Sequence, residues 1–439
     1  MNLRVTLSIM ALCLAMSFSA SAANVSVNCS KPQTGAFPSI NAALNSLDPA
    51  GPNMITVQGT CKENVFLFYF QRLTIQAVNG KTAVIENAAN PAAIVLQAFG
   101  CRGLVLLNLV IQGGTVGLLV NQSSEAVIQN VVSRDNSSDG IVAQIDSTLG
   151  IENSKSVNNG GNGLTVASAS NSTLSTQPGE TILFSGNAGN GVDVDAAYLQ
   201  VNFGAIHVEN NAGAAVFAQN GQLLFFGGNV AGQPNVFKNN GEGIDLFDTS
   251  SARLFAENLI QNNGEVGLQV VGGSSAEFFA FSLQDGSIGE TIVQGHTGPG
   301  VNVVRSSTAT FTGPNLVRQN GSTTDPLSSG IRVEHGSVTL DGARVAGNTG
   351  PGILAGQGSA ITVLDGATIQ NNSEDGVRLR IQSNADFSQP ITIAGNGGSS
   401  VSCDPSSIAF GDFTGIKNVN CNVQAEVERT VTKSRVVLH

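Results

Sequence analysis

The stretch Asn158-Asn159-Gly160-Gly161-Asn162-Gly163-Leu164-Thr165-Val166 decides the fold, because its pattern recurs along most of the chain. In each copy, two asparagines precede a glycine, which is followed by an apolar residue, a variable residue and a second apolar residue. Further copies begin at Asn239, Asn262 and Asn371, and the common spacing is about 24 residues. A fixed period of this length indicates one supersecondary unit that is stacked many times.

Each unit is expected to hold short strands and no long helix. Apolar and polar residues alternate in short runs that are broken by glycine and asparagine, which favours strands and tight turns. A unit of about 24 residues with three such strands is one coil of a parallel β-helix. The apolar residue after each repeat glycine marks about 13 coils, at Ile94, Leu118, Ile141, Leu164, Val192, Val216, Ile244, Leu268, Val301, Ile331, Ile353, Val377 and Val401.

The asparagines and glycines of the repeat are expected to be scaffold. Both residue types tolerate the left-handed backbone that a tight corner between strands requires. Stacked asparagine side chains can also hydrogen bond to one another and to the backbone of the next coil. Longer intervals between markers predict loop inserts, at Thr176–Glu180, Gly227–Pro234, Asp285–Gly295 and Ser322–Ser328.

Both ends of the stack are predicted to be closed, since open strand edges invite aggregation. Residues 23–53 form an N-terminal cap, in which Ile40, Ala43, Leu44 and Leu47 are spaced as one face of a short helix. The β-helix itself spans residues 54–401. Residues 402–421 form a C-terminal cap, and residues 422–439 are a polar tail that is either extended or disordered.

The cysteines fit this arrangement. Cys29 with Cys61 and Cys403 with Cys421 are the two pairs that position suggests. Cys101 is left over, and it is either a buried small apolar residue or a reactive thiol that pairs with another molecule.

Residues 1–22 are expected to be a secretory signal peptide. Arg4 supplies the positive start, residues 7–18 are apolar, and Ala20-Ser21-Ala22 is a small-residue cleavage site. No later stretch is long and apolar enough to predict a transmembrane span. The mature chain is therefore expected in the periplasm or outside the cell.

The composition disfavours several partners. Only 12% of the residues are charged and the formal net charge is −11, which argues against nucleic acid or a membrane surface as a partner. The chain has no tryptophan and only two tyrosines, Tyr69 and Tyr198. Phe217 and Phe247 are the aromatic residues expected on the outside of the coils, where they could contact a carbohydrate.

The repeats resemble those of the right-handed parallel β-helix proteins of the pectin-lyase-like superfamily. The resemblance rests on copies such as Asn136…Gly140-Ile141-Val142-Ala143 and on the early stretch Gly103–Gly114, and it covers nearly all of residues 54–401. It implies an all-β, single-stranded, right-handed parallel β-helix. The superfamily includes polysaccharide lyases, glycoside hydrolases, epimerases, esterases, adhesins and phage tailspikes, so the fold alone names no reaction. The enzyme signatures are mostly absent, since Gly295-His296-Thr297 and Arg380-Ile381-Gln382 are only partial matches.

Two ionisable clusters are the candidate sites, because the residue after each marker is expected to point outward. The acidic cluster consists of Asp193, Asp195 and Asp245. Its carboxylates could act as an acid–base pair or hold a cation such as calcium, or they could be solvated surface charges. The basic cluster contains Arg378 and Arg380, with Arg332 and Glu334 nearby. It could bind or deprotonate an acidic sugar, or it could be a surface ion-pair network.

These observations favour a binding or structural role for an exported protein at the cell envelope or outside the cell, with a glycan as the leading ligand class. The alternative is a polysaccharide lyase or glycoside hydrolase that uses one of the two clusters. No cofactor is required by either interpretation, although calcium is compatible with both, and the sequence names no metal ligands. An enzyme would need these side chains in a groove that is walled by the insert loops, whereas a flat strand face would favour binding.

Overall fold

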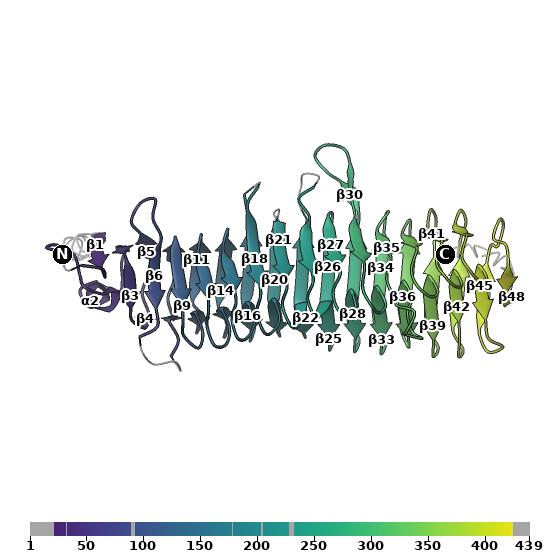
Figure 1. The fold of residues 1–439 in the computed structure, drawn as a ribbon, viewed down its shortest axis with the longest axis horizontal. Helices are drawn as coiled ribbons and strands as arrows, with labels where there is room; N and C mark the ends of the chain where they lie inside the picture. The colour runs from purple at the N-terminus through teal and green to yellow at the C-terminus, as the bar shows by residue number, and fades with distance from the viewer. Residues whose placement is uncertain are drawn as a thin grey trace, which may run out of the picture.

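The chain winds into a rod of stacked coils (Figure 1). The computed structural model describes residues 22–31, 33–88, 93–177, 179–202, 205–227 and 232–424. The predicted signal peptide, apart from Ala22, and residues 425–439 of the predicted tail lie outside the described residues. About 14 coils at a spacing of about 4.8 Å give a rod about 65 Å long. The prediction of a parallel β-helix is confirmed.

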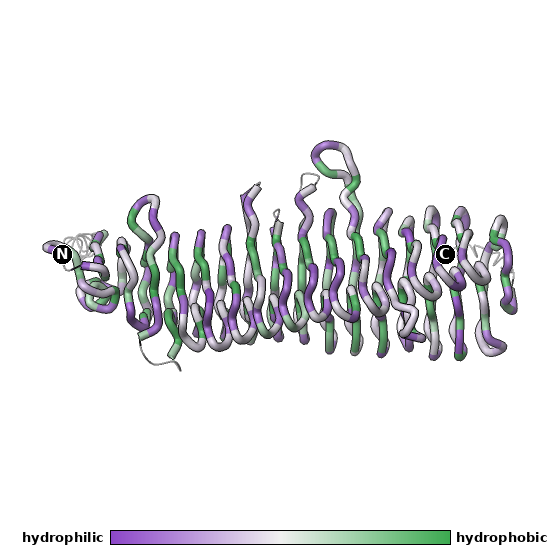
Figure 2. The backbone as a smooth tube through the Cα atoms, in the orientation of Figure 1, coloured by the Kyte–Doolittle hydropathy of each residue, from purple (hydrophilic) through white to green (hydrophobic). Residues whose placement is uncertain are grey.

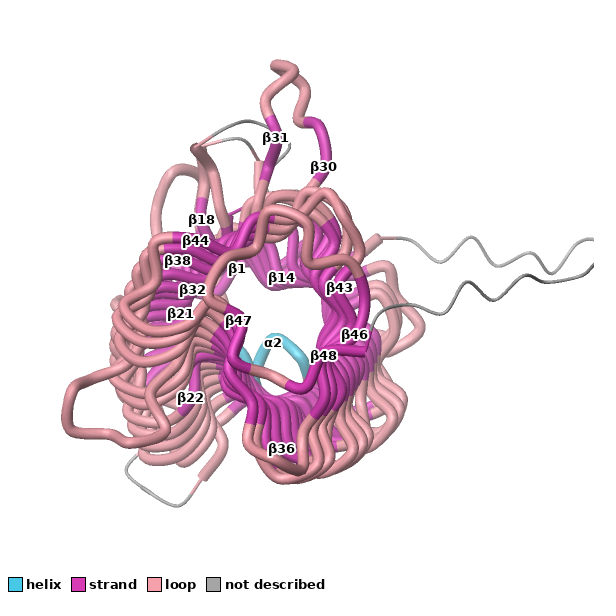
Figure 3. Tube along the Cα trace, turned by 90° about the vertical axis from the view of Figure 1, so that its right-hand side faces the viewer, coloured by secondary structure: helices cyan, strands magenta, loops and turns pink. Residues whose placement is uncertain are grey.

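Three long parallel sheets form the walls of the rod, and Figure 3 shows them end-on around the packed interior. The 17-stranded sheet contains β1 (Ala23–Asn28), β2 (Asn53–Gln58), β5 (Leu73–Ala77), β8 (Leu104–Leu107), β11 (Glu125–Gln129), β14 (Thr148–Glu152), β17 (Asn171–Ser175), β20 (Tyr198–Asn202), β23 (Gln222–Phe226), β26 (Ser251–Phe255), β29 (Ser275–Phe279), β34 (Thr308–Thr312), β37 (Ser337–Asp341), β40 (Ala360–Val363), β43 (Asn384–Phe387), β46 (Ile408–Gly411) and β48 (Asn422–Gln424).

The 14-stranded sheet follows it in each coil. It contains β3 (Thr60–Lys62), β6 (Ala83–Glu86), β9 (Leu109–Gln112), β12 (Val132–Arg134), β15 (Lys155–Val157), β18 (Thr181–Ser185), β21 (Ala205–Glu209), β24 (Asn235–Lys238), β27 (Asn258–Gln261), β32 (Thr291–Gln294), β35 (Leu316–Arg318), β38 (Arg344–Ala346), β41 (Thr368–Gln370) and β44 (Thr392–Ala394).

The 15-stranded sheet closes each coil and contains the predicted marker residues except Ile94, which lies before β7 (Leu96–Phe99), because Leu96 is the residue aligned with the marker Leu118. It contains β4 (Val65–Phe68), β7 (Leu96–Phe99), β10 (Leu118–Asn121), β13 (Ile141–Ala143), β16 (Leu164–Ala167), β19 (Val192–Asp195), β22 (Ala214–Gln219), β25 (Glu242–Phe247), β28 (Leu268–Val271), β33 (Val301–Val304), β36 (Ile331–Glu334), β39 (Ile353–Gly356), β42 (Val377–Leu379), β45 (Val401–Cys403) and β47 (Val419–Asn420).

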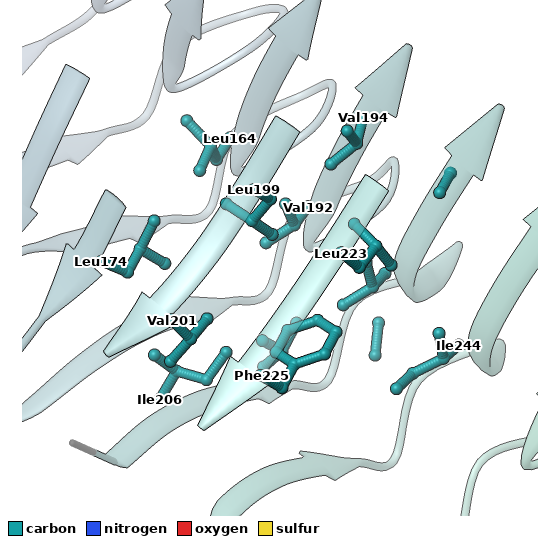
Figure 4. Packing of buried hydrophobic residues seen from close by; sticks show 14 of the residues in the cluster. Leu164, Leu174, Val192, Val194, Leu199, Val201, Ile206, Leu223, Phe225 and Ile244 are labelled. Carbon is teal, nitrogen blue, oxygen red and sulfur yellow. The ribbon is translucent and has the colours of Figure 1, made fainter. Parts of the chain in front are cut away.

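The core is a continuous apolar column along the rod axis. Alternate residues of each strand point inward, so that apolar and polar segments alternate along the tube in Figure 2. Figure 4 shows Leu164, Val192 and Ile244, from β16, β19 and β25 of the 15-stranded sheet, packed in this way, and all three are fully buried. Phe278 and Phe311 stack inside with ring centroids 4.3 Å apart. Each such side chain contributes about 1.5–3 kcal/mol through burial, but only when its neighbouring coils are present.

A ladder of asparagines holds the corner between the 14- and 15-stranded sheets. The second asparagine of each pair is buried, and its side-chain amide donates to the next one along the rod, as between Asn159 and Asn187 at 2.9 Å. Its backbone N–H donates to the same oxygen. The first asparagine, such as Asn158 with φ of 55°, takes the left-handed conformation at the corner. The predicted scaffold role of the asparagine pair is confirmed.

The repeat glycine has a different role from the one expected. Gly163 does not have a positive φ. A Cβ atom at this position would lie 2.6 Å from the carbonyl oxygen of Gly191 and 2.8 Å from the side-chain nitrogen of Asn187. The glycine is therefore needed because the backbone and the ladder of the next coil pass too close for a side chain.

A second ladder, made of serines, holds the corner between the 15- and 17-stranded sheets. Each backbone N–H donates to the serine hydroxyl of the next coil, as from Ser124 to Ser147 and from Ser147 to Ser170. Cys101 occupies the first position of this ladder, since its N–H donates to Ser124 Oγ at 3.1 Å. Its thiol is buried, which raises its pKa, and it lies 3.4 Å from the carbonyl oxygen of Leu67. The structure thus gives Cys101 a scaffold position, as the first of the two interpretations expected.

The ends are closed as predicted, although the strands extend beyond residues 54–401 on both sides. The helix α2 (Ile40–Leu44) covers the first coil, and its first N–H groups donate to the buried Glu63 carboxylate. The predicted disulfides Cys29–Cys61 and Cys403–Cys421 are confirmed. Strand β1 already pairs with β2, and β48 still pairs with β46, so each cap contains part of a coil.

His296 replaces asparagine at one position of the ladder. Its Nδ1 accepts the N–H of Asn263 at 3.2 Å, and its own N–H donates to Asn320. Its Nε2 lies 3.2 Å from the carbonyl oxygen of Ile260 and donates to it, so the ring is the neutral tautomer. Burial lowers the pKa of His296 to about 4.

The ladder predicts opposite outcomes for two adjacent asparagines. Asn159→Ala removes the acceptor of two donors of Asn136, and we expect a loss of about 2–4 kcal/mol in unfolding free energy. Asn158→Gly keeps the left-handed corner and should change it by less than about 1 kcal/mol. Urea titration measures both values, and equal losses would contradict the ladder.

His296 predicts a specific loss of stability in acid. The unfolded ring titrates near 6.5 and the folded ring near 4, so stability is lost as pH falls through this window, by about 3 kcal/mol in total. His296→Asn should remove this loss. His335→Asn, at an exposed corner, should retain it, and equal pH profiles for the two variants in urea titrations would contradict the assignment.

Candidate functional site

The outer face of the 15-stranded sheet carries the predicted site residues, but not in one place. Asp193 and Asp195 lie on β19 and Asp245 lies on β25, with β22 between them. Arg378 lies on β42, five strands beyond β25, which is about 24 Å away. The acidic and basic clusters therefore belong to separate parts of the face.

The basic cluster is an ion-pair network. Arg378 contacts Asp375 at 2.7 Å and Glu374 at 2.8 Å, and Arg332 contacts Glu334 at 2.8 Å. Burial acts to raise the pKa of Asp375, but hydrogen bonds from Ser402 and Arg378 outweigh it and lower this pKa. These are the contacts expected from the second interpretation of this cluster. A catalytic role of Arg378 and Arg380 stays a prediction.

Asp193 lies at one end of a row of hydrogen-bonded polar side chains on the outer face. It accepts hydrogen bonds from the side-chain amides of Asn190 at 3.0 Å and Asn162 at 3.3 Å. Burial raises the pKa of Asp193, and the charges of Asp139 and Asp195 add to this effect. Asp195, two residues further along β19, is exposed.

Asp245 is the most unusual residue of the face. The expectation of a solvated outward carboxylate was wrong for it, because its side chain is only 4% exposed. Its Oδ1 has no hydrogen-bond partner among the described residues. Burial raises its pKa to about 9, and the neighbouring carboxyl groups of Glu242 and Glu265 contribute. At neutral pH Asp245 is therefore protonated and can donate a hydrogen bond.

A shallow pocket lies over Asp245. Its volume is about 380 Å³, and its polar lining comes from Asn190, Glu242, Asp245 and Glu265, with backbone from the corner residues 212–214 and 241. On the other side of Asp245 stand two half-buried phenylalanines. Phe217 is its register partner on β22 and Phe247 is two residues along β25. Their rings stack 5.5 Å apart at 28°.

Three of the four predicted inserts do not wall this face, whereas the fourth, at 322–328, leaves the corner between the 14- and 15-stranded sheets before β36, three strands beyond β25. The inserts at 176–180 and 285–295 leave the corner between the 17- and 14-stranded sheets, which is away from the outer face of the 15-stranded sheet. The second of these overlaps the antiparallel hairpin of β30 (Phe281–Ser282) and β31 (Ile288–Gly289), which begins before the predicted insert and projects from the rod in Figures 1 and 3. The insert at 227–234 leaves the same corner and is only partly described. A shallow, open face results around Asp245.

The described residues offer no ready metal site. Among them, Cys29, Cys61 and Glu63 are the only three ligand-type residues whose atoms lie within 4.8 Å of one another, and the two sulfurs form a disulfide. Calcium at the acidic cluster stays a prediction.

Sequence reasoning missed Glu242 and Glu265. It considered only outward residues after each marker, whereas the residue before the repeat glycine, three positions before the first of them, shares the same part of the face. Asn190 with Asp193, Glu242 with Asp245 and Asp375 with Arg378 are such pairs, and the structure brings each pair into interaction. This spacing of three could have found Glu242. Glu265 lies on the corner before β28, and no comparable spacing in the sequence could have found it.

The comparisons identify the class of protein. The family model of the right-handed β-helix region matches residues 68–178 and 116–283. Together with the observed sheets, this match confirms that the chain forms a right-handed parallel β-helix. No curated protein matches the sequence.

Several solved structures are similar at low identity. The A-module of the mannuronan C-5 epimerase AlgE4 from Azotobacter vinelandii is 12% identical, with 84% of this chain and 93% of that chain covered and a TM-score of 0.41. The pectate lyase Pel9A is 13% identical, with 74% and 77% covered and a TM-score of 0.34. A chain of the Vag8–C1 inhibitor complex is 13% identical, with 92% and 98% covered and a TM-score of 0.44.

The protonated state of Asp245 predicts a pH-dependent gain in stability for Asp245→Asn. A folded pKa near 9 against an unfolded value near 3.9 means that wild-type stability falls as pH rises between these values. The asparagine cannot ionise, so the variant should exceed wild type by more than about 1 kcal/mol at pH 8 and by little at pH 4. Asp146→Asn, at an exposed corner, is the matched control in urea titrations. No gain at pH 8 would contradict the assignment.

Proposed function

We propose that the protein binds a neutral glycan on the outer face of the 15-stranded sheet, at Asp245. The observation that carries the proposal is the buried, protonated carboxyl group whose Oδ1 lacks a partner among the described residues, at the base of an open pocket. A buried polar atom without a partner is costly, and a ligand hydroxyl that bonds to it removes this cost.

The surroundings of Asp245 suit a sugar ring. Phe217 and Phe247 offer an apolar surface beside it, and Asn190 and the carboxylates offer hydrogen-bonding groups for hydroxyls. Glu242 and Glu265 at the pocket disfavour an anionic sugar through like-charge repulsion. A neutral glycan therefore fits better than a uronic acid polymer.

Export of the chain is part of this proposal. The signal-peptide pattern of residues 1–22 and the two disulfides both suit an oxidising compartment outside the cytoplasm. None of the described helices has the length and apolarity to cross a membrane.

A glycoside hydrolase is the second candidate, and the pKa of Asp245 is the observation that favours it. A carboxyl group protonated at neutral pH is a general acid, and Glu242 or Glu265 would be its ionised partner. A lyase is less compatible, because Arg378 is about 24 Å away and paired with acids. The pocket at Asp245 is shallow and open, which places binding ahead of hydrolysis.

Two substitutions at Asp245 separate these functions. Asp245→Asn keeps a donor and should retain glycan binding within about threefold, whereas Asp245→Ala should weaken it at least about tenfold, the value of one hydrogen bond. Calorimetry with neutral hexasaccharides and with polygalacturonate and alginate, with and without calcium, measures the affinities. Asp146→Asn is the control.

The same panel tests the alternatives. If the wild-type protein releases reducing ends from one of these glycans and Asp245→Asn abolishes this release, the protein is a hydrolase. No binding to any neutral glycan, or equal affinities for wild type and Asp245→Ala, would contradict the proposed function.

A further inference from the structure

Two consecutive coils have a shortened corner between the 15- and 17-stranded sheets. Several corners of this column contain three residues, of which the first two have positive φ, as at Ser168 and Ala169 or at Asp248 and Thr249. Between β19 and β20 the corner has only Ala196 and Ala197, and between β22 and β23 only Asn220 and Gly221. Each of these corners has lost one left-handed residue, since only Ala196 and Asn220 have positive φ.

The serine ladder also changes at these two coils. Ala197 and Gly221 occupy the positions that Ser170 and Ser250 occupy in the flanking coils. These two corners therefore have smaller side chains as well as a shorter backbone. The result is a recess of about 330 Å³ between the longer corners on either side. It opens at the end of β19 and β22, whose outward residues Asp193 and Phe217 belong to the proposed binding face.

The recess is lined by groups that suit a neutral sugar. The ring of Tyr198 is shared with an adjoining depression, and Asn171, Asn220 and Gln222 supply hydrogen-bonding side chains. The charged residues of the adjoining depression, Arg253 and Glu277, form an ion pair at 2.8 Å and offset each other. The lining therefore presents an aromatic ring and polar groups without a net charge.

We infer that this recess is a second subsite, in which one unit of a neutral glycan packs against the Tyr198 ring. The ligand class rests on the proposed function, whereas the position of the subsite does not. Tyr198 supplies the apolar ring face, and Asn171, Asn220 and Gln222 bond the hydroxyl groups. The recess follows β22, the neighbour of β25, so a glycan that leaves Asp245 diagonally across β22 reaches it.

The composition of the chain allows a direct measurement. It has no tryptophan and only two tyrosines, so in a Tyr69→Phe variant every tyrosine emission comes from Tyr198. The full-length variant is titrated with cellohexaose, xylohexaose and mannohexaose. We expect a saturable change of emission with at least one of them. No change with any of the three would overturn the subsite.

A one-residue insertion tests the recess and keeps the side chains of Tyr198, Asn171, Asn220 and Gln222 that are proposed to contact the sugar. In the Tyr69→Phe background, Ala196-Ala197 is replaced by Ser-Ala-Ser, the sequence of the three-residue corner at residues 168–170. The inserted residue should fill the recess and weaken the Tyr198 response at least about tenfold. The same insertion at a third two-residue corner, His335-Gly336, is the control and should leave the response unchanged. Equal responses for both insertions would overturn the subsite.

Asp245→Ala in the same background separates the subsite from the proposed face. A Tyr198 response that survives this substitution supports the subsite even if the face fails. If calorimetry detects binding that Asp245→Ala abolishes, but the emission of Tyr198 does not change with any glycan, the subsite is overturned. The proposed face at Asp245 then stands.

Discussion

The satisfaction of buried polar groups at the corners is the constraint on which this rod depends. Every coil turns three times, and each turn would leave backbone N–H groups buried without a partner. At two of the three corners, the asparagine and serine ladders supply such partners from the next coil. The apolar column inside drives the stacking, but it has no directional preference, and the ladders fix the register of the coils.

The same ladders explain where the molecule departs from regularity. His296 continues the asparagine ladder with one ring nitrogen as acceptor and therefore must stay neutral. Cys101 is the first residue of the serine ladder, and its backbone N–H donates to the hydroxyl of Ser124. Ala197 and Gly221 interrupt that ladder on a shortened corner and leave a recess. Asp245 lies on the outer face, where no ladder operates, and it keeps an oxygen without a partner among the described residues. His296 and Cys101 keep the hydrogen bonds of the ladders, whereas Ala197 and Asp245 line pockets at the surface.

The sequence predicted the fold well because the repeat encodes it at every level. The markers gave the inward residues, the asparagine pairs gave the corners, and the spacing of cysteines gave both disulfides. The site was harder to predict. A pattern of period two shows that Asp245 points outward but cannot show that neighbouring corners cover it. The role of Gly163 was also misjudged, since close approach of the next coil is a tertiary effect that resembles a turn requirement in the sequence.

Native-state hydrogen exchange tests the central claim most directly. If the ladders hold the corners, the backbone amides of Asn159, Asn187 and Asn211, although they lie in turns, exchange as slowly as those of the buried strand β19. Exchange of these amides as fast as in the projecting turn at residues 283–287 would show that the corners open independently of the coils, and it would contradict the account.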